Sequence, residues 1–410
     1  MGAGLFTVPQ ARTTDKTILS HGIHTTKFPN LPVHKNAGML YKRMPIEIES
    51  PEQMGYDTIK NNLSESSYTD TLFGEIGDLG ATLKDLVLCY GSHEGHEGLR
   101  DLLIKDEPSL QREDVLLTMG AASGLFIIAT SLLQPGDELV VVRPNYATNI
   151  ETPRTIGATL RYVDLRFEDG FTLDPEAVRK AISKSTKYIS VTYPHNPTGA
   201  CLGDEAMKAL VSIAREYKIP LLVDETYRDM VFGQPLPLAA TYWEGVISVS
   251  SLSKSYGLPG LRMGWIICRD RQLMETFLAA KEQMFICGSP LDEEVSYRYL
   301  LQKDRHFTRI KKDIRQKFDI VKNWMSGQDV LEWKEPTGGV VCFPRVRKPE
   351  TVDIDRFYET LLKKYGTYTG PGHWFEMPRH YMRIGFGWPS SAQLEEGLAA
   401  ISKSLAEAAL

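Results

Sequence analysis

Residues 246–262 read VISVSSLSKSYGLPGLR. The opening VISVS is short, apolar and rich in β-branched residues, so it predicts a buried strand. Two hydroxyls, Ser251 and Ser253, then a lysine, Lys254, and an arginine, Arg262, follow that one strand. In open α/β sheets, ligands bind just beyond the carboxyl ends of the strands, where loops converge and helix N-termini point their N–H groups inward. The stretch therefore predicts an α/β fold with a ligand site beyond this strand.

Similar short apolar runs recur along the chain, and helix-favouring stretches separate them. The further runs are 115–117, 138–142, 187–192, 219–223 and 265–268, and the helical stretches include 97–103, 123–133, 175–182 and 205–217. An order of strand, helix, strand predicts a mainly parallel sheet that is covered on both faces.

The rest of the chain divides around this sheet. Residues 1 to about 75 are irregular, whereas the C-terminal part has a charged helical stretch (304–324), a β-like stretch (338–344) and a final amphipathic helix ending at Leu410. We expect residues 1–77 to form an N-terminal arm and part of a small domain, 78–290 a large ligand-binding domain, and 291–410 a small α+β domain.

The composition is that of an ordinary globular protein, with 42% hydrophobic and 24% charged residues. The net charge is -5, without a block of basic residues, so we expect neither nucleic acid nor an anionic membrane as the main partner. The five cysteines lie far apart and form no CxxC pair, and the first thirty residues contain no long apolar run. These features predict a cytoplasmic protein.

Polar or small residues follow the other apolar runs too. Ala121 and Ala122 open a helix after the first run, Tyr146 and Asn196 follow the next two, and Asp224 ends the fourth. A small-residue turn, a core tyrosine and a bend at an Asn-Pro step each have an ordinary structural explanation. A carboxylate that directly ends an apolar strand is harder to explain, because its burial needs a cationic partner or a helix to cap.

Two histidines and a glutamate, His93, Glu94 and His96, occur close together, as metal ligands often do. Their spacing does not fit the HExxH pattern. We expect a loop that leads into a helix at Glu97, and no metal site.

Three strings, taken together, resemble the class I and II aminotransferases, which are enzymes of fold type I that use pyridoxal 5'-phosphate (PLP). They are SLSKSYGLPGLRMGW (251–265), NPTG (196–199) and DETY (224–227), and their order and spacing agree with the family from about residue 85 to 400. The resemblance implies a mainly parallel, seven-stranded-type sheet in a large domain with a smaller α+β domain, and a PLP-dependent enzyme that acts on an amino acid.

The resemblance also assigns roles to single residues. Lys254 would hold the cofactor as a Schiff base and then move the substrate's α-proton. Asp224 would pair with the ring nitrogen. The remaining cofactor contacts would be Asn196 and Tyr227 on the phenolic oxygen, Tyr146 stacked on the ring, and Arg262, Ser251, Ser253, Ala121 and Ala122 at the phosphate.

Two further residues are assigned by family position. Arg383, in the string YMRIG (381–385), would bind the substrate's α-carboxylate, and Asn196 would lie beside it. Tyr90 would reach the phosphate of a neighbouring subunit, so the resemblance implies a homodimer with shared sites.

The reaction stays open between two outcomes. The family as a whole implies transamination, which we expect here. The alternative is elimination and ring closure, because the strings TYPHNPTGACL, SLSKSYGLPGLRMGW, TGGVVCFPR and MRIGFGWP are especially similar to capreomycidine synthase-like enzymes, which eliminate a substituent from a hydroxylated or basic amino acid and close a ring. The N-terminal arm carries Glu47, Glu49 and Glu52, and these acids either receive a basic substrate side chain or form a solvated surface.

Some relatives of this fold are transcription regulators, in which a winged-helix domain precedes the enzyme-like part. No basic helix-turn-helix pattern precedes residue 75, and both Lys254 and Asp224 are present. We therefore expect an enzyme.

Overall fold

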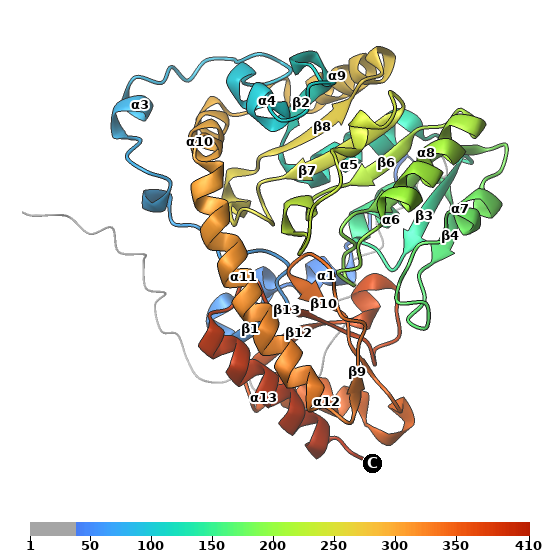
Figure 1. Cartoon of the computed structure of the whole chain (residues 1–410), viewed down its shortest axis with the longest axis vertical. Coiled ribbons are helices and arrows are strands. Elements are labelled where there is room, and N and C mark those ends of the chain that lie inside the picture. Colours follow the sequence, from blue (N-terminus) through green and yellow to red (C-terminus); the bar gives the residue numbers. More distant parts are fainter. Residues whose placement is uncertain (1–37) are drawn as a thin grey trace, which may run out of the picture. The chain divides into compact units, whose positions relative to one another are not determined.

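The computed structural model describes residues 38–410, and a seven-stranded sheet lies in its upper part in Figure 1. The strand order is β2 (Val115–Thr118), β8 (Gly264–Cys268), β7 (Val246–Ser251), β6 (Leu221–Asp224), β5 (Thr186–Thr192), β3 (Glu138–Arg143) and β4 (Thr159–Asp164). Neighbouring strands are parallel except that β8 runs antiparallel to both β2 and β7. The predicted mainly parallel α/β sheet is confirmed.

Helices cover both faces of this sheet, and alternate residues of one strand show how. In β3, Leu139 and Val141 pack with residues of α5 (Gly120–Leu132), α6 (Ala147–Ile156) and α9 (Arg271–Phe285). Val140 and Val142 point to the other face, where they pack with α7 (Pro175–Ala181) and α8 (Asp204–Tyr217). Because successive side chains of a strand point to opposite faces, strands buried on both sides appear in the sequence as continuous apolar runs.

A second sheet lies below the first in Figure 1. Its order is β1 (Asn61–Leu63), β12 (Thr367–Pro371), β13 (Met382–Gly385) and β10 (Val341–Cys342). Beside it lie α11 (Lys303–Ser326), α12 (Ile354–Lys363), α13 (Ser391–Glu407) and a small pair of strands, β9 (Leu331–Glu332) and β11 (Arg345–Val346). The final helix thus ends at Glu407, three residues before the predicted end at Leu410.

The remaining helices precede or flank the large sheet. They are α1 (Pro45–Ile48), α2 (Pro51–Met54), α3 (Gly80–Lys84), α4 (Glu97–Ile104) and α10 (Pro290–Leu300). The predicted helix at Glu97 is present, and the His96 ring caps it by accepting a hydrogen bond from the Leu99 N–H at 3.0 Å. His93 contacts Glu282 of α9.

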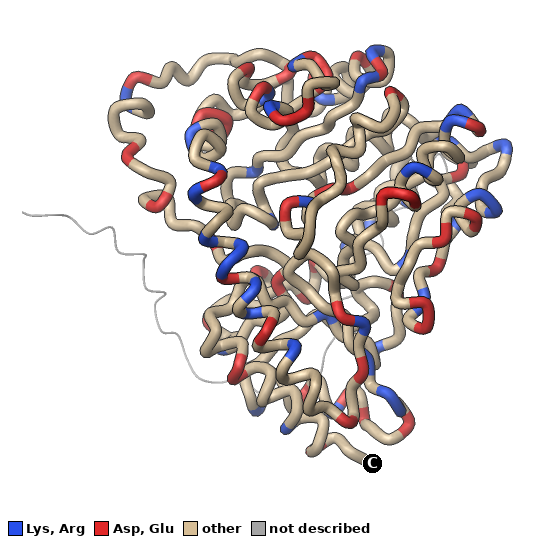
Figure 2. The backbone as a smooth tube through the Cα atoms, in the orientation of Figure 1, with Lys and Arg blue, Asp and Glu red and all other residues tan. Residues whose placement is uncertain are grey.

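The predicted three-part division into 1–77, 78–290 and 291–410 stays a prediction. The strand β1 belongs to the small sheet, although the sequence around it showed only irregular structure. The first thirty residues, whose sequence contains no long apolar run, lie outside the described residues. Among residues 38–410, no helix combines the length and the apolar character that crossing a membrane requires. Figure 2 shows acidic and basic residues interspersed along the described chain.

Candidate active site

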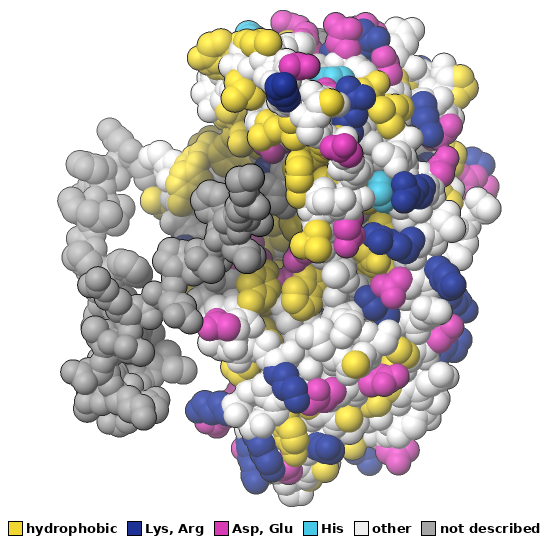
Figure 3. Space-filling model, turned by 90° about the vertical axis from the view of Figure 1, so that its left-hand side faces the viewer, with side chains coloured by type: hydrophobic (Ala, Val, Ile, Leu, Met, Phe, Trp, Pro, Cys, Tyr) yellow, Lys and Arg dark blue, Asp and Glu magenta, His cyan; other side chains and the backbone are white. Residues whose placement is uncertain are grey.

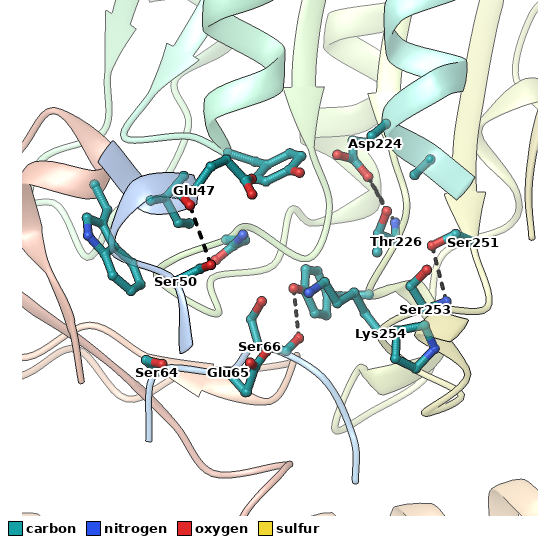
Figure 4. Close-up of a pocket in the computed structure, with 18 of the residues that line it drawn as sticks. Glu47, Ser50, Ser64, Glu65, Ser66, Asp224, Thr226, Ser251, Ser253 and Lys254 are labelled. Carbon is teal, nitrogen blue, oxygen red and sulfur yellow. Dashed lines mark hydrogen bonds between the residues drawn. The ribbon is translucent and has the colours of Figure 1, made fainter. Parts of the chain in front are cut away.

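A cavity of about 380 Å³ collects almost all of the predicted site residues. The predicted residues that line it are Ala121, Ala122, Tyr146, Asn196, Asp224, Tyr227, Ser251, Ser253, Lys254, Arg262 and Arg383. They come from the carboxyl ends of β5, β6 and β7, from the start of α5, from the residue before α6 and from β13 of the small sheet. Figure 4 shows Ser251, Ser253 and Lys254 on one side of the pocket and Glu47 and Ser50 on the other.

At one end of the pocket, the N-terminus of α5 meets Arg262. Gly120 has a φ of +78°, which favours glycine, and a Cβ added to it would lie 2.8 Å from Nη2 of Arg262, so the guanidinium lies close against this backbone. A Cβ at Gly264 of β8 would lie 2.4 Å from the carbonyl carbon of Gly120. The bare backbone therefore lets β8 and α5 approach closely. The N–H groups of the helix start, with the hydroxyls of Ser251 and Ser253, form a cradle that suits an anion.

Asp224 is buried at the end of β6, and neutral groups donate every hydrogen bond that it accepts there. Its Oδ1 accepts from the Thr226 N–H at 3.1 Å and from the Thr226 hydroxyl at 2.6 Å, and its Oδ2 accepts from Nδ2 of Asn149 at 3.4 Å. Burial raises the pKa of the Asp224 carboxyl, although these hydrogen bonds oppose the shift. A buried carboxylate held in this way favours a cationic ligand.

Arg383 is buried on β13, and only some of its hydrogen-bond donors have partners among the described residues. Its Nη2 donates to the Ser64 carbonyl at 2.7 Å and its Nη1 to Oδ1 of Asn196 at 3.2 Å, while its Nε has no partner among the described residues. The guanidinium lies 4.9 Å from the centre of the Phe375 ring and 5.9 Å from that of Trp374. A buried guanidinium with a free donor, near two aromatic rings, is suited to bind a carboxylate.

Lys254 and two tyrosines, Tyr146 and Tyr227, also line the pocket. The Tyr227 hydroxyl donates to the Ser66 carbonyl at 2.9 Å, and burial raises its pKa to about 12. Burial also raises the pKa of Tyr146. The Lys254 carbonyl accepts a hydrogen bond from the Tyr68 N–H at 2.9 Å, which fixes the backbone from which the lysine reaches into the pocket.

Acidic residues stand at the mouth of the pocket. Glu47 and Glu52 line it and are exposed, and Glu65, half-buried, lines it from the loop after β1. Of the three acids predicted from the arm, Glu49 is not among the lining residues, since its carboxylate accepts a hydrogen bond from Nε1 of Trp374 at 2.7 Å. Three residues at the site, Glu65, Asn149 and Trp374, were not predicted from the sequence. Thr226, which donates a hydrogen bond to Asp224, is part of the string DETY, but no role was predicted for it.

Tyr90 lies outside this cavity and is 80% exposed. Its predicted role on a neighbouring subunit stays a prediction.

The fold and the pocket define a class: a mainly parallel α/β enzyme fold whose strand ends carry a lysine, a buried aspartate and an anion cradle. Residues 62–401 match the family aminotransferase class I and II, and the chain belongs to that family. It is an enzyme of this family, whose members act on amino acids.

Among its relatives, capreomycidine synthase of Streptomyces vinaceus is 32% identical over 369 residues, covering 85% of this chain and 91% of the relative. Aspartate aminotransferase of Pyrococcus horikoshii is 28% identical over 303 residues, covering 72% of this chain and 76% of the relative. The crystal structure of the PLP-dependent cyclase OrfR, 26% identical, superposes with a TM-score of 0.81 over 91% of this chain and 100% of the other. The chain is thus similar to aminotransferases and to cyclases.

Proposed function

We propose that this chain is a PLP-dependent enzyme that removes the α-proton of a basic L-amino acid and then eliminates a β-substituent and closes a ring. The proposal rests on one observation. Lys254, Asp224 and Arg383 line the same cavity, and acidic residues line its mouth.

The residues present fit PLP at three points. The cradle formed by the start of α5, Ser251, Ser253 and Arg262 suits a phosphate. Asp224 is buried and accepts hydrogen bonds from neutral groups alone, which suits a protonated ring nitrogen. Lys254 supplies an amine for covalent attachment.

PLP bound there would supply an electron-accepting ring that stabilises negative charge at the substrate's α-carbon. The chain's own residues do the rest. Arg383 holds the substrate's carboxylate, so that the α-carbon is fixed relative to Lys254. The Nζ of Lys254, once freed, takes the α-proton as a general base. Tyr227 and Asn196 supply polar groups to the cavity, and Tyr146 supplies an aromatic ring that could stack on the cofactor.

The acidic mouth supports a basic substrate. Glu47 and Glu52 of the arm and Glu65 of the β1 loop all line the cavity that also contains Arg383. A substrate whose carboxylate is bound by Arg383 can extend a cationic side chain towards these acids.

The choice between the two outcomes rests on relatives. In sequence, capreomycidine synthase is more similar to this chain, and over a larger share of it, than the aspartate aminotransferase of Pyrococcus horikoshii is. In elimination, Lys254 first takes the α-proton, a β-hydroxyl group then takes up a proton and leaves as water, and a side-chain nitrogen can add at the β-carbon. Transamination is the second candidate, which the 28% identity to aspartate aminotransferase favours.

The test is turnover of basic amino acids, with and without a β-hydroxyl group, in the absence of any oxoacid acceptor. From the β-hydroxylated substrate, we expect continuous formation of a product that is lighter by one water molecule. Mass spectrometry measures this product over time. Conversion that stops after one equivalent of enzyme, with the amino group retained on the cofactor, would establish transamination and overturn elimination.

The double variant Glu47→Gln/Glu52→Gln should raise KM for basic amino acids and leave kcat nearly unchanged. Both acids are exposed, so solvent screens them, and the loss should be at most about fivefold for each acid. Neutral amino acids should show no change. Glu395→Gln, exposed on α13, is the matched control. An unchanged preference for basic over neutral amino acids in the double variant would exclude the role of these acids.

We also propose a homodimer in which Tyr90 reaches the neighbouring site, in a cytoplasmic enzyme. Large hydrophobic side chains are exposed at Leu72, Phe73, Val87 and Leu88 as well as at Tyr90. Their segment lies at the left of Figure 1, and Figure 3, which views that side, shows hydrophobic side chains gathered on part of it. An apolar area of this kind supports an interface. The five cysteines, all unpaired, suit a reducing compartment.

A further inference from the structure

Glu49 stands at the bend between the two short helices of the arm and faces away from the pocket. Its neighbours on both sides, Glu47 of α1 and Ser50 and Glu52 around the start of α2, line the cavity. The carboxylate of Glu49 instead contacts the turn that follows β12, Gly372–Phe375. The arm thus presents one set of side chains to the pocket and a different one to the small sheet.

Three contacts join Glu49 to this part of the small sheet. Its Oε2 accepts a hydrogen bond from Nε1 of Trp374 at 2.7 Å and lies 3.0 Å from Nε2 of His373. The Tyr368 hydroxyl donates to the Glu49 carbonyl at 2.9 Å. Burial opposes ionisation of Glu49, but the bonds from His373 and Trp374 outweigh it and lower the pKa of the carboxyl. The contact is therefore charge-assisted, and such bonds are stronger than neutral ones.

Trp374 connects this contact to Arg383, the residue proposed to bind the substrate's carboxylate. The Trp374 ring is buried, lines the cavity and lies 5.9 Å from the Arg383 guanidinium. Gly370 lies in β12, the strand that pairs with β13, and a Cβ at this position would lie 3.0 Å from the Trp374 ring. Glycine there therefore lets the tryptophan pack against β12. Glu49 therefore joins the acidic arm to the element that flanks Arg383.

The arm needs such an anchor. Both α1 and α2 have four residues, and helices of that length are not stable by themselves in water, so tertiary contacts fix their position. Ile46 and Pro51 are buried and supply apolar contacts. Glu49 forms hydrogen bonds with Tyr368, His373 and Trp374.

We propose that Glu49 is a positioning residue that holds the arm against His373 and Trp374, and thereby sets Glu47 and Glu52 at the mouth of the substrate pocket. The part that concerns the substrate rests on the function proposed above. The docking of the arm does not, and it can be measured without any substrate.

The first measurement is hydrogen exchange of residues 45–54 in the cofactor-loaded protein. Glu49→Ala should speed exchange of this segment about tenfold or more, because it removes charge-assisted hydrogen bonds. Glu49→Gln keeps an oxygen that can accept from Trp374, so it should rescue part of the protection. Glu395→Ala, exposed on α13, should change nothing in this segment. Unchanged exchange in Glu49→Ala would overturn the proposal, whatever the enzyme's activity.

The second measurement separates binding from chemistry. Glu49→Ala should raise KM about tenfold with kcat altered less than about threefold, and Glu49→Gln should fall between it and the wild type. Trp374→Phe removes the same hydrogen bond, so Glu49→Ala should cost less in that background. Fully additive effects would overturn the pairing. Faster exchange with an unchanged KM would overturn the substrate-positioning part, whereas a wild type that turns over no amino acid would refute the proposed function and leave the exchange result standing.

Discussion

Lys254→Ala should lose turnover by at least about a thousandfold, because in the proposed function one amine supplies both the covalent attachment of the cofactor and the base that takes the α-proton. Lys254 is also the one lysine among the residues that line the described cavity, so no neighbour can replace it. The visible absorbance of covalently attached PLP should disappear from the purified variant. Absorbance spectra and the mass of the borohydride-reduced protein measure this directly.

Lys254→Arg is the matched control, since it keeps the positive charge. Arginine cannot be deprotonated in proteins, and so it can neither attach the cofactor nor accept the α-proton. We therefore expect it to be as inactive as the alanine variant. A covalent chromophore that persists in either variant would refute the assignment of Lys254.

The central strands of the large sheet could be predicted from the sequence, but the edge strand β4 and the helix α6 could not. The apolar runs that became β3, β5, β6 and β7 are continuous because both faces of those strands are covered by helices. The strand β4 is at the edge, and Thr159, Arg161 and Asp164 are exposed or half-exposed, so no continuous run marks it. The helix α6 contains Pro153, which weakens its helical pattern.

The site divides in a similar way. Asp224, Lys254 and Asn196 could be found because each follows a strand whose carboxyl end faces the ligand. Glu65 and Trp374 lie in connections of the small sheet, and only tertiary packing brings them to the pocket. Nothing in the acidic arm showed that Glu47 and Glu52 face the cavity while Glu49 turns away, because that depends on the path of the bend between two four-residue helices.

Asp224→Asn should have opposite effects on the free and the loaded protein. Burial holds the pKa of Asp224 in the folded protein above its unfolded value. The folded state then binds more protons, so the free energy of unfolding of the cofactor-free protein falls as the pH rises through the interval between the two pKa values, and it stays lower at neutral pH. Asparagine cannot ionise, and its oxygen can still accept both hydrogen bonds from Thr226, so only the long 3.4 Å bond from Asn149 is lost. The cofactor-free variant should therefore melt at the same temperature as the wild type or higher at neutral pH.

The loaded variant should be the weaker one, because we propose that the same carboxylate, which costs stability in the free protein, pairs with a protonated ring nitrogen. Without it, PLP should bind at least about tenfold more weakly, and turnover should fall about a hundredfold or more because the developing negative charge loses its stabilisation. Calorimetric melting with and without PLP measures both signs. Glu225→Gln is the control, since Glu225 is buried beside Asp224, has a pKa raised by burial to about 7, and does not line the cavity. It should alter melting but not PLP affinity. Wild-type PLP affinity in Asp224→Asn would show that Asp224 is buried for structural reasons alone.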